Sequence, residues 1–147
     1  AGWGPGQLDK ELAASAWFAI VLVQVWARVV PVWLLSSERY IAHAESKSQG
    51  LVAGARDLQS EPRTRPTQVL VALGWGGLAV ALGIGCGWLP GVTAAAIAAA
   101  ALAPLPLLAR GFRRSMGGIT GDLLGAAEQI AELCAWVAAC AAFGSRG

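Results

Sequence analysis

The sequence predicts an all-α fold, a polytopic membrane bundle of about four transmembrane helices. Of its 147 residues, 56% are hydrophobic and only 14% are charged, whereas charged residues make up about 25% of an ordinary soluble domain. So few charges cannot easily build a water-soluble surface around this much apolar material. A soluble, alanine-rich bundle would still need polar faces on its helices, and most of these segments have none. We therefore interpret residues 1–147 as a single domain embedded in a lipid bilayer.

The first two hydrophobic segments are each long enough to cross a bilayer, which takes about 20 helical residues. Segment 13–35 is apolar except for Gln24 and Arg28. Segment 69–89 contains no charged residue. Both are expected to be transmembrane helices.

The third and fourth segments are less regular. Segment 92–109 follows a turn expected at Pro90-Gly91 and carries no charge, and we expect Pro104 and Pro106 to kink it. Segment 119–143 has a continuous apolar stretch too short to cross alone. It can span only if it carries three acidic residues into or near the membrane: Asp122, Glu128 and Glu132.

Basic residues gather on one side of these spans. Most of the 11 Lys and Arg residues lie in two loops, 36–68 and 110–118, and the tight turn between the second and third spans has none. By the positive-inside rule, both basic loops are expected to be cytoplasmic and both termini to lie on the other side.

Two features argue against common classes of site. The net charge of +2 is too small to indicate a nucleic-acid partner. The three cysteines, Cys86, Cys134 and Cys140, lack metal-ligand spacing and are interpreted as small buried hydrophobic residues.

The last span carries the residues best suited to chemistry. On a helix with about 100° per residue, its three acids share one arc of about 120° with Gln129, Gly121 and Gly125. We expect this arc to face the protein interior, where an acid needs a metal ion, a basic side chain or a proton. Alternatively, Glu128 and Glu132 face a water-filled crevice, and Asp122 is a first-turn residue stabilised by the helix dipole.

Glycine and arginine residues accompany these acids. The four-residue spacing of Gly117, Gly121 and Gly125 would let another backbone approach closely. Arg113 and Arg114 lead into a helix N-terminus, and arginine side chains with free backbone N–H groups suit a phosphate. Each feature has a simpler explanation in helix packing, topology or lipid-headgroup contact. It is their combination that points to a phosphate-and-metal site.

Arg28 is a second charge inside a predicted span. It could pair with an acid of the last helix, bind a phosphate at the cytoplasmic end, or extend its side chain to the membrane interface. The sequence leaves all three open.

The segment Gly117-Gly-Ile-Thr-Gly-Asp-Leu-Leu-Gly-Ala126, followed by Glu128 and Glu132, resembles the C-terminal signature of the cobalamin synthase family, the adenosylcobinamide-GDP ribazoletransferases. Ala27-Arg28 and Lys47-Ser-Gln-Gly-Leu51 are weaker points of similarity. Lys47 stands where the family tends to have arginine, which would weaken bidentate phosphate binding. The family's N-terminal acidic motif has no counterpart here. We therefore expect the C-terminal part of a longer enzyme, or a shortened relative.

The resemblance implies a membrane phosphotransferase acting late in cobalamin biosynthesis. The hydroxyl of α-ribazole, or of its 5′-phosphate, would attack adenosylcobinamide-GDP and release GMP. The cofactor implied is Mg²⁺. The implied location is the inner (plasma) membrane of a prokaryote, with the active loops cytoplasmic. An N-terminal half of the enzyme, or a second copy of the chain, would be the protein partner.

The resemblance also implies residue roles. Asp122 would be a metal ligand or the base that orients the attacking hydroxyl, with Glu128 and Glu132 as outer ligands or orienting groups. The implied phosphate-binding residues are Arg113, Arg114, Arg28, Lys47, Gly117, Gly118, Thr120 and Gly121. The competing hypothesis is a non-enzymatic small membrane subunit or transporter fragment whose acids carry protons or cations. A path for protons or cations does not need the arginine- and glycine-containing segment that precedes Asp122.

Overall fold

The computed structural model describes residues 5–38, 66–116 and 118–144, and the structural statements below refer to these ranges. This part of the chain folds into helices α1 (Pro5–Ser37), α2 (Pro66–Gly85), α3 (Gly91–Leu102), α4 (Leu105–Met116) and α5 (Gly121–Gly144).

Four helical stretches are long and apolar enough to cross a membrane: Ala13–Ser37, Thr67–Gly85, Gly91–Ser115 and Gly121–Gly144. They overlap the four segments expected from the sequence. The predicted fold class, a helical membrane bundle with about four spans, is therefore confirmed.

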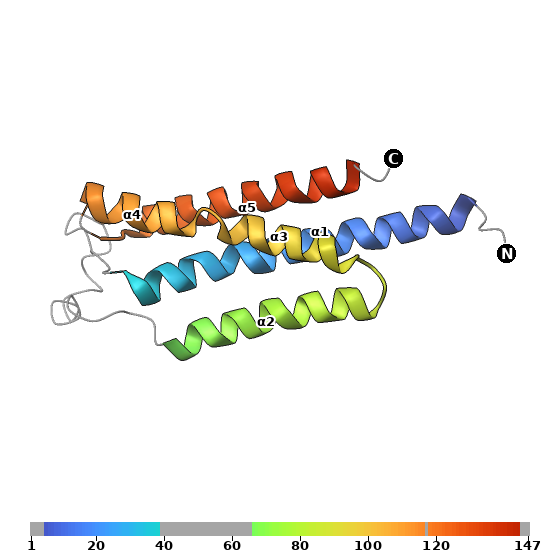
Figure 1. Cartoon of the computed structure of the whole chain (residues 1–147), viewed down its shortest axis with the longest axis horizontal. Helices are drawn as coiled ribbons and strands as arrows, with labels where there is room; N and C mark the ends of the chain where they lie inside the picture. Colours follow the sequence, from blue (N-terminus) through green and yellow to red (C-terminus); the bar gives the residue numbers. More distant parts are fainter. Residues whose placement is uncertain (1–4, 39–65, 117, 145–147) are drawn as a thin grey trace, which may run out of the picture.

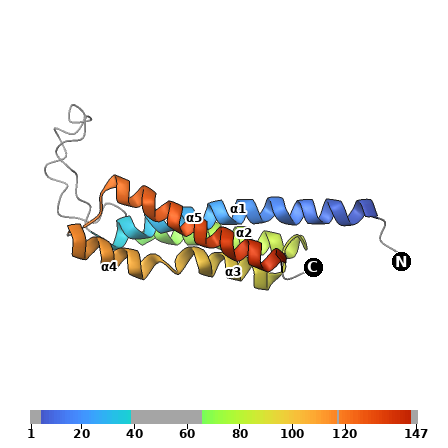
Figure 2. The ribbon, with the colours of Figure 1, turned by 90° about the horizontal axis from the view of Figure 1, so that it is seen from above.

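The helices form an elongated bundle in which α1 is central (Figure 1). Helix α1 packs against α2, α3 and α5, and α3 also packs against α5. The end of α1, the end of α4 and the start of α5 lie at the same end of the bundle in both views (Figures 1 and 2), and the α2–α3 turn lies at the other. The basic residues of α4 are thus brought to the end where α5 begins.

A stripe of alanines joins α5 to its neighbours. Ala127, Ala131, Ala135 and Ala139 are the buried residues of α5 and recur every fourth position, so they lie on one face of the helix. Small side chains allow helices in a membrane to approach closely. Large apolar side chains such as Leu133 and Val137 are exposed, as expected for a lipid-facing surface.

The α2–α3 connection is a glycine-capped turn. Gly87 has a φ of +71°. Its N–H donates to the Ile84 carbonyl, and the Trp88 N–H donates to the Gly83 carbonyl, at 3.0 Å each. This is the Schellman arrangement, which favours glycine at the left-handed position. The turn therefore precedes the Pro90-Gly91 site expected from the sequence, and Pro90 instead caps α3.

Pro104 lies at the break between α3 and α4, within the third span, where we expected a kink. A proline has no N–H to donate and its ring clashes with the preceding turn, so the helix is interrupted there. Pro106 lies in the first turn of α4, where a proline is tolerated. The break separates the alanine-rich α3 from the arginine-bearing α4.

The prediction that all three cysteines are buried is wrong. Cys86 and Cys140 are exposed and Cys134 is intermediate. Cys86 lies in the α2–α3 turn, and Cys140 lies on the side of α5 away from the alanine stripe.

Candidate functional site

Thr120 builds the N-terminus of α5. Its Oγ1 accepts a hydrogen bond from the Leu123 N–H at 3.4 Å, and its carbonyl accepts one from the Leu124 N–H at 3.1 Å. This is an N-cap, which satisfies one of the otherwise unpaired N–H groups of the first turn. The N–H groups of Gly121 and Asp122 have no acceptor within the helix and are available to an anion.

Ile119 fixes this N-terminus against α4. Its side chain is fully buried and belongs to a hydrophobic cluster with Leu105 and Ala109 of α4 and Leu34 of α1. Gly118 is buried beside it. The segment 118–120 is thus packed against α4, which carries Arg113 and Arg114. Residues 110–116, expected to be a loop, belong to this helix.

Asp122 lies in the first turn of α5 with an exposed side chain. Within the described part of the chain it has no ion-pair or hydrogen-bond partner. Its position matches the alternative in which the helix dipole stabilises the carboxylate.

The predicted interior arc of α5 is only partly correct. Glu128 and Glu132 are half-buried, but Asp122, Gln129, Gly121 and Gly125 are exposed. The reason is that the alanine stripe forms the packed face, and this stripe lies on the far side of the two glutamates from Asp122. A Cβ placed on Gly125 would meet no heavy atom of the described residues within 4 Å, so Gly125 is not a point of close helix approach.

Glu132 is held between two donors. Its Oε1 accepts a hydrogen bond from Gln24 Nε2 of α1 at 2.6 Å and another from Trp136 Nε1, one turn further along α5, at 3.3 Å. Hydrogen bonds to an ionised acceptor are stronger than those between neutral groups. The arrangement orients the Glu132 carboxylate and ties α5 to α1.

Glu128 pairs with Arg28. The Arg28 Nε lies 3.7 Å from Glu128 Oε1. Of the three alternatives open for Arg28, the geometry therefore favours pairing with an acid of the last helix. The same pair supplies Glu128 with the counter-charge that an acid in a membrane helix needs.

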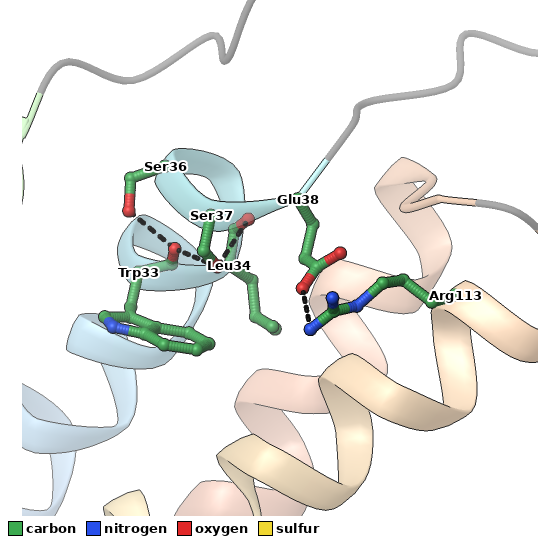
Figure 3. A network of polar contacts seen from close by, with 6 residues as sticks. All are labelled: Trp33, Leu34, Ser36, Ser37, Glu38 and Arg113. Carbon is green, nitrogen blue, oxygen red and sulfur yellow. Dashed lines mark hydrogen bonds and ion pairs between the residues drawn. The ribbon is translucent and has the colours of Figure 1, made fainter.

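Arg113 pairs with a glutamate at the end of α1 (Figure 3). One of its terminal nitrogens lies 3.0 Å from Glu38 Oε1. Glu38 is buried, whereas Arg113 and Arg114 are exposed on α4. Arg114 has no partner among the described residues.

The structure brings some predicted site residues together and leaves others apart. Arg113, Arg114, Gly118, Thr120, Gly121 and Asp122 share one end of the bundle. No group of three or more His, Cys, Asp or Glu side chains in the described ranges could hold a metal ion, so the three acids do not form a common metal site there. Lys47 and Gly117 lie outside the described residues.

Three residues that contact predicted site residues have no role predicted from the sequence: Gln24, Trp136 and Glu38. Gln24 was noted only as a polar exception in an apolar span, although a buried amide in a membrane usually has a partner. Trp136 lies four residues after Glu132, a spacing at which helical side chains meet. Glu38 lies in the loop expected at 36–68 and has no distinguishing signal in the sequence.

The comparisons with known proteins agree with the predicted resemblance. A family model described as cobalamin-5-phosphate synthase matches residues 7–140. The adenosylcobinamide-GDP ribazoletransferase of Leptothrix cholodnii is 36% identical over 127 residues, which are 84% of this chain and 43% of that protein. The protein of the same name from Shewanella frigidimarina is 33% identical over 135 residues, 89% of this chain and 46% of that protein.

No solved structure matches the chain significantly. The chain spans less than half the length of the curated relatives it matches. The family match nevertheless extends over most of its residues, and the predicted resemblance is confirmed. The chain belongs to the cobalamin-5-phosphate synthase family.

Proposed function

We propose that this chain takes part in joining α-ribazole, or its 5′-phosphate, to adenosylcobinamide-GDP with release of GMP. The family and the names of the relatives support this reaction. The structural observation that carries the proposal is the end of the bundle where the Thr120-capped start of α5 packs against the arginine-bearing α4.

This end of the bundle suits a diphosphate. Arg113 and Arg114 can donate several N–H groups to phosphate oxygens, and the N–H groups of Gly121 and Asp122 add backbone donors at the positive end of the helix dipole. In phosphoryl transfer most of the protein's contribution is positioning and charge stabilisation. These groups would hold the diphosphate so that the ribazole hydroxyl can approach it.

In the proposed reaction the hydroxyl oxygen attacks the phosphorus attached to cobinamide. The bond from that phosphorus to the bridging oxygen breaks, and GMP leaves with that oxygen. Asp122 would orient the attacking hydroxyl and accept its proton, a role that suits a carboxylate with no other partner in the described structure.

The donors at this end also fit Mg²⁺. In proteins Mg²⁺ is usually held by one or two carboxylates together with substrate phosphates. The alternative role of Asp122 is that of the Mg²⁺ ligand instead of the base, because Glu128 and Glu132 are already engaged by α1 and Trp136. When bound, the ion would neutralise charge on the diphosphate and on the leaving GMP.

Glu128 and Glu132 act in this proposal through their contacts with α1. Each has a partner on that helix, Arg28 and Gln24 respectively. They tie α5 to α1 beside the alanine stripe that sets the rotation of α5, and they thereby support the position of Asp122.

We infer that this end of the bundle faces the cytoplasm of a prokaryote and that the spans lie in its plasma membrane. The support is the cluster of Arg110, Arg113 and Arg114 at that end, since basic residues next to spans are retained on the cytoplasmic side.

The test is turnover in membranes. Vesicles from cells that express the wild-type protein from its own locus are given adenosylcobinamide-GDP with α-ribazole or its 5′-phosphate. We expect equal amounts of GMP and the joined cobalamin product, and none from cells in which the locus is deleted. Absence of product with both acceptors, together with proton or cation flux through the wild-type protein, would favour the transporter hypothesis instead.

A further inference from the structure

The Glu38 side chain is unusual among the charged groups of the described chain. It is only 4% exposed, yet it belongs to an acidic residue at the end of a membrane-spanning helix. A buried carboxylate is costly unless a counter-charge and hydrogen bonds compensate it. Its counter-charge is Arg113, which lies on a different helix 75 positions later in the chain.

The end of α1 holds Glu38 in a fixed place (Figure 3). The Glu38 N–H donates to the Leu34 carbonyl at 2.9 Å. The hydroxyls of Ser36 and Ser37 donate to the Trp33 carbonyl at 2.7 and 3.0 Å. Leu34 itself is fully buried. These contacts secure the backbone that carries the carboxylate.

Arg113 shares only part of its donor capacity with Glu38. A guanidinium has five N–H donors in a planar fork, and the contact to Glu38 uses one terminal nitrogen. The Arg113 side chain is 62% exposed, so its other donors remain accessible. The neighbouring Phe112 packs against the same cluster as Ile119, so the turn of α4 that carries Arg113 is packed against the segment that leads into α5.

We propose that Glu38 is the positioning residue for Arg113, holding its guanidinium toward a diphosphate at the start of α5. This inference rests on the proposed function, in which Arg113 binds that diphosphate. An arginine in solution samples many rotamers, and an arginine already fixed in its binding geometry loses less conformational freedom when the ligand arrives. Glu38 acts through Arg113 and does not itself contact the substrate.

Arg114 provides a matched control, because it is adjacent, exposed and without a partner among the described residues. Loss of either arginine removes charge-assisted hydrogen bonds to phosphate and should weaken binding by about 10-fold or more. Only the loss of binding caused by replacing Arg113 should depend on whether Glu38 is present.

The experiment measures the KM for adenosylcobinamide-GDP, kcat, and the inhibition constant of inorganic pyrophosphate for the protein in membranes. The variants are Glu38→Gln, Glu38→Asp, Arg113→Gln, Arg114→Gln, and each arginine variant combined with Glu38→Gln. Thermal unfolding of each purified protein in detergent reports stability separately.

Glu38→Gln should raise the KM and the pyrophosphate inhibition constant together, by about 5- to 10-fold, with little change in kcat, because the diphosphate contact is made in both ground and transition states. Glu38→Asp keeps the charge and should recover part of this loss. In the Arg113→Gln background, Glu38→Gln should raise the KM and the inhibition constant little further. In the Arg114→Gln background, the fold-changes of the two substitutions should multiply.

The proposal is overturned if Glu38→Gln shifts only the unfolding temperature and leaves both constants within about twofold of wild type. It is also overturned if the fold-changes in these constants caused by Glu38→Gln and Arg113→Gln multiply, as those of Glu38→Gln and Arg114→Gln do. Failure of the proposed function has a different signature. In that case the wild-type protein makes no cobalamin product. Pyrophosphate binding can then be measured by the protection it gives against thermal unfolding. If Glu38 positions Arg113, this affinity still falls in Glu38→Gln.

Discussion

Arg28 of α1 and Glu128 of α5 meet across the helix interface, with Arg28 Nε 3.7 Å from a carboxylate oxygen of Glu128. Both residues lie inside helices long and apolar enough to cross a membrane. The Arg28 side chain is 74% exposed and that of Glu128 is 31% exposed. The pair therefore lies at the edge of the packed interface.

A double-mutant cycle should detect this pair. We expect Arg28→Gln and Glu128→Gln each to destabilise the protein, and the double variant to be more stable than the sum of the two by about 1 kcal/mol or less, the size typical of polar contacts between membrane helices. The measurement is the free energy of unfolding in detergent. Arg110→Gln combined with Glu128→Gln is the control and should be additive. If the changes in unfolding free energy are additive in both double variants, the Arg28–Glu128 pair contributes nothing to stability.

Gln24 should matter more to stability than other polar side chains of the spans. Replacing it with leucine removes the 2.6 Å donor to Glu132 and leaves a half-buried carboxylate with the weaker Trp136 contact. We expect a loss of about 1 kcal/mol in the free energy of unfolding. Gln129→Leu on the exposed face of α5 makes the same chemical change and should cost less. Equal losses for the two variants would contradict the assigned contact.

Gly83 of α2 lies directly against the Phe18 side chain of α1. A Cβ at this position would overlap the ring of Phe18, which packs against Trp88 with ring centroids 5.4 Å apart. We expect Gly83→Ala to lower the unfolding free energy by about 1–3 kcal/mol through overpacking. At Gly77 on the same helix a Cβ meets nothing within 4 Å among the described residues, so Gly77→Ala should be neutral or stabilising. Phe18→Ala should relieve the Gly83→Ala defect, and its failure to do so would reject this cause.

The inferred topology can be tested with a native cysteine. Cys86 is exposed in the α2–α3 turn, at the opposite end of the bundle from α4 (Figure 1). After Cys134 and Cys140 are replaced by alanine, a membrane-impermeant maleimide should label Cys86 in intact cells with a permeable outer envelope. A cysteine at Ser115 should react only after the plasma membrane is opened. The reverse labelling pattern would show that the topology is opposite to the inferred one.

Hydropathy and proline chemistry made most of the fold predictable from the sequence. Long uncharged segments must be helical in a bilayer, because every backbone group needs an internal partner there. Pro104 interrupts the third span because a proline has no N–H to donate, and this holds whatever the span packs against. The exact α2–α3 turn was not predictable in this way, because Gly87 competes with Pro90-Gly91 as the turn signal.

The rotation of α5 was harder to predict because polarity and packing select different faces. The polarity pattern predicts that the acids face inward, since acids in a membrane need partners. The packed face is instead set by Ala127, Ala131, Ala135 and Ala139, which are inconspicuous by hydropathy but allow close approach. Glu128 and Glu132 border this stripe and find partners on α1, whereas Asp122 falls outside it. Partners such as Glu38 depend on how distant helices meet, and no local pattern in the sequence specifies that.

Turnover by Asp122→Asn tests the central claim most directly. GMP release from adenosylcobinamide-GDP is measured in membranes that contain equal amounts of the wild-type protein, Asp122→Asn, or Gln129→Glu as an exposed control on the same helix. We expect the rate to fall by about 100-fold or more in Asp122→Asn and to stay near the wild-type rate in Gln129→Glu. A wild-type rate of GMP release in Asp122→Asn would contradict the claim that this end of the bundle carries the transfer chemistry.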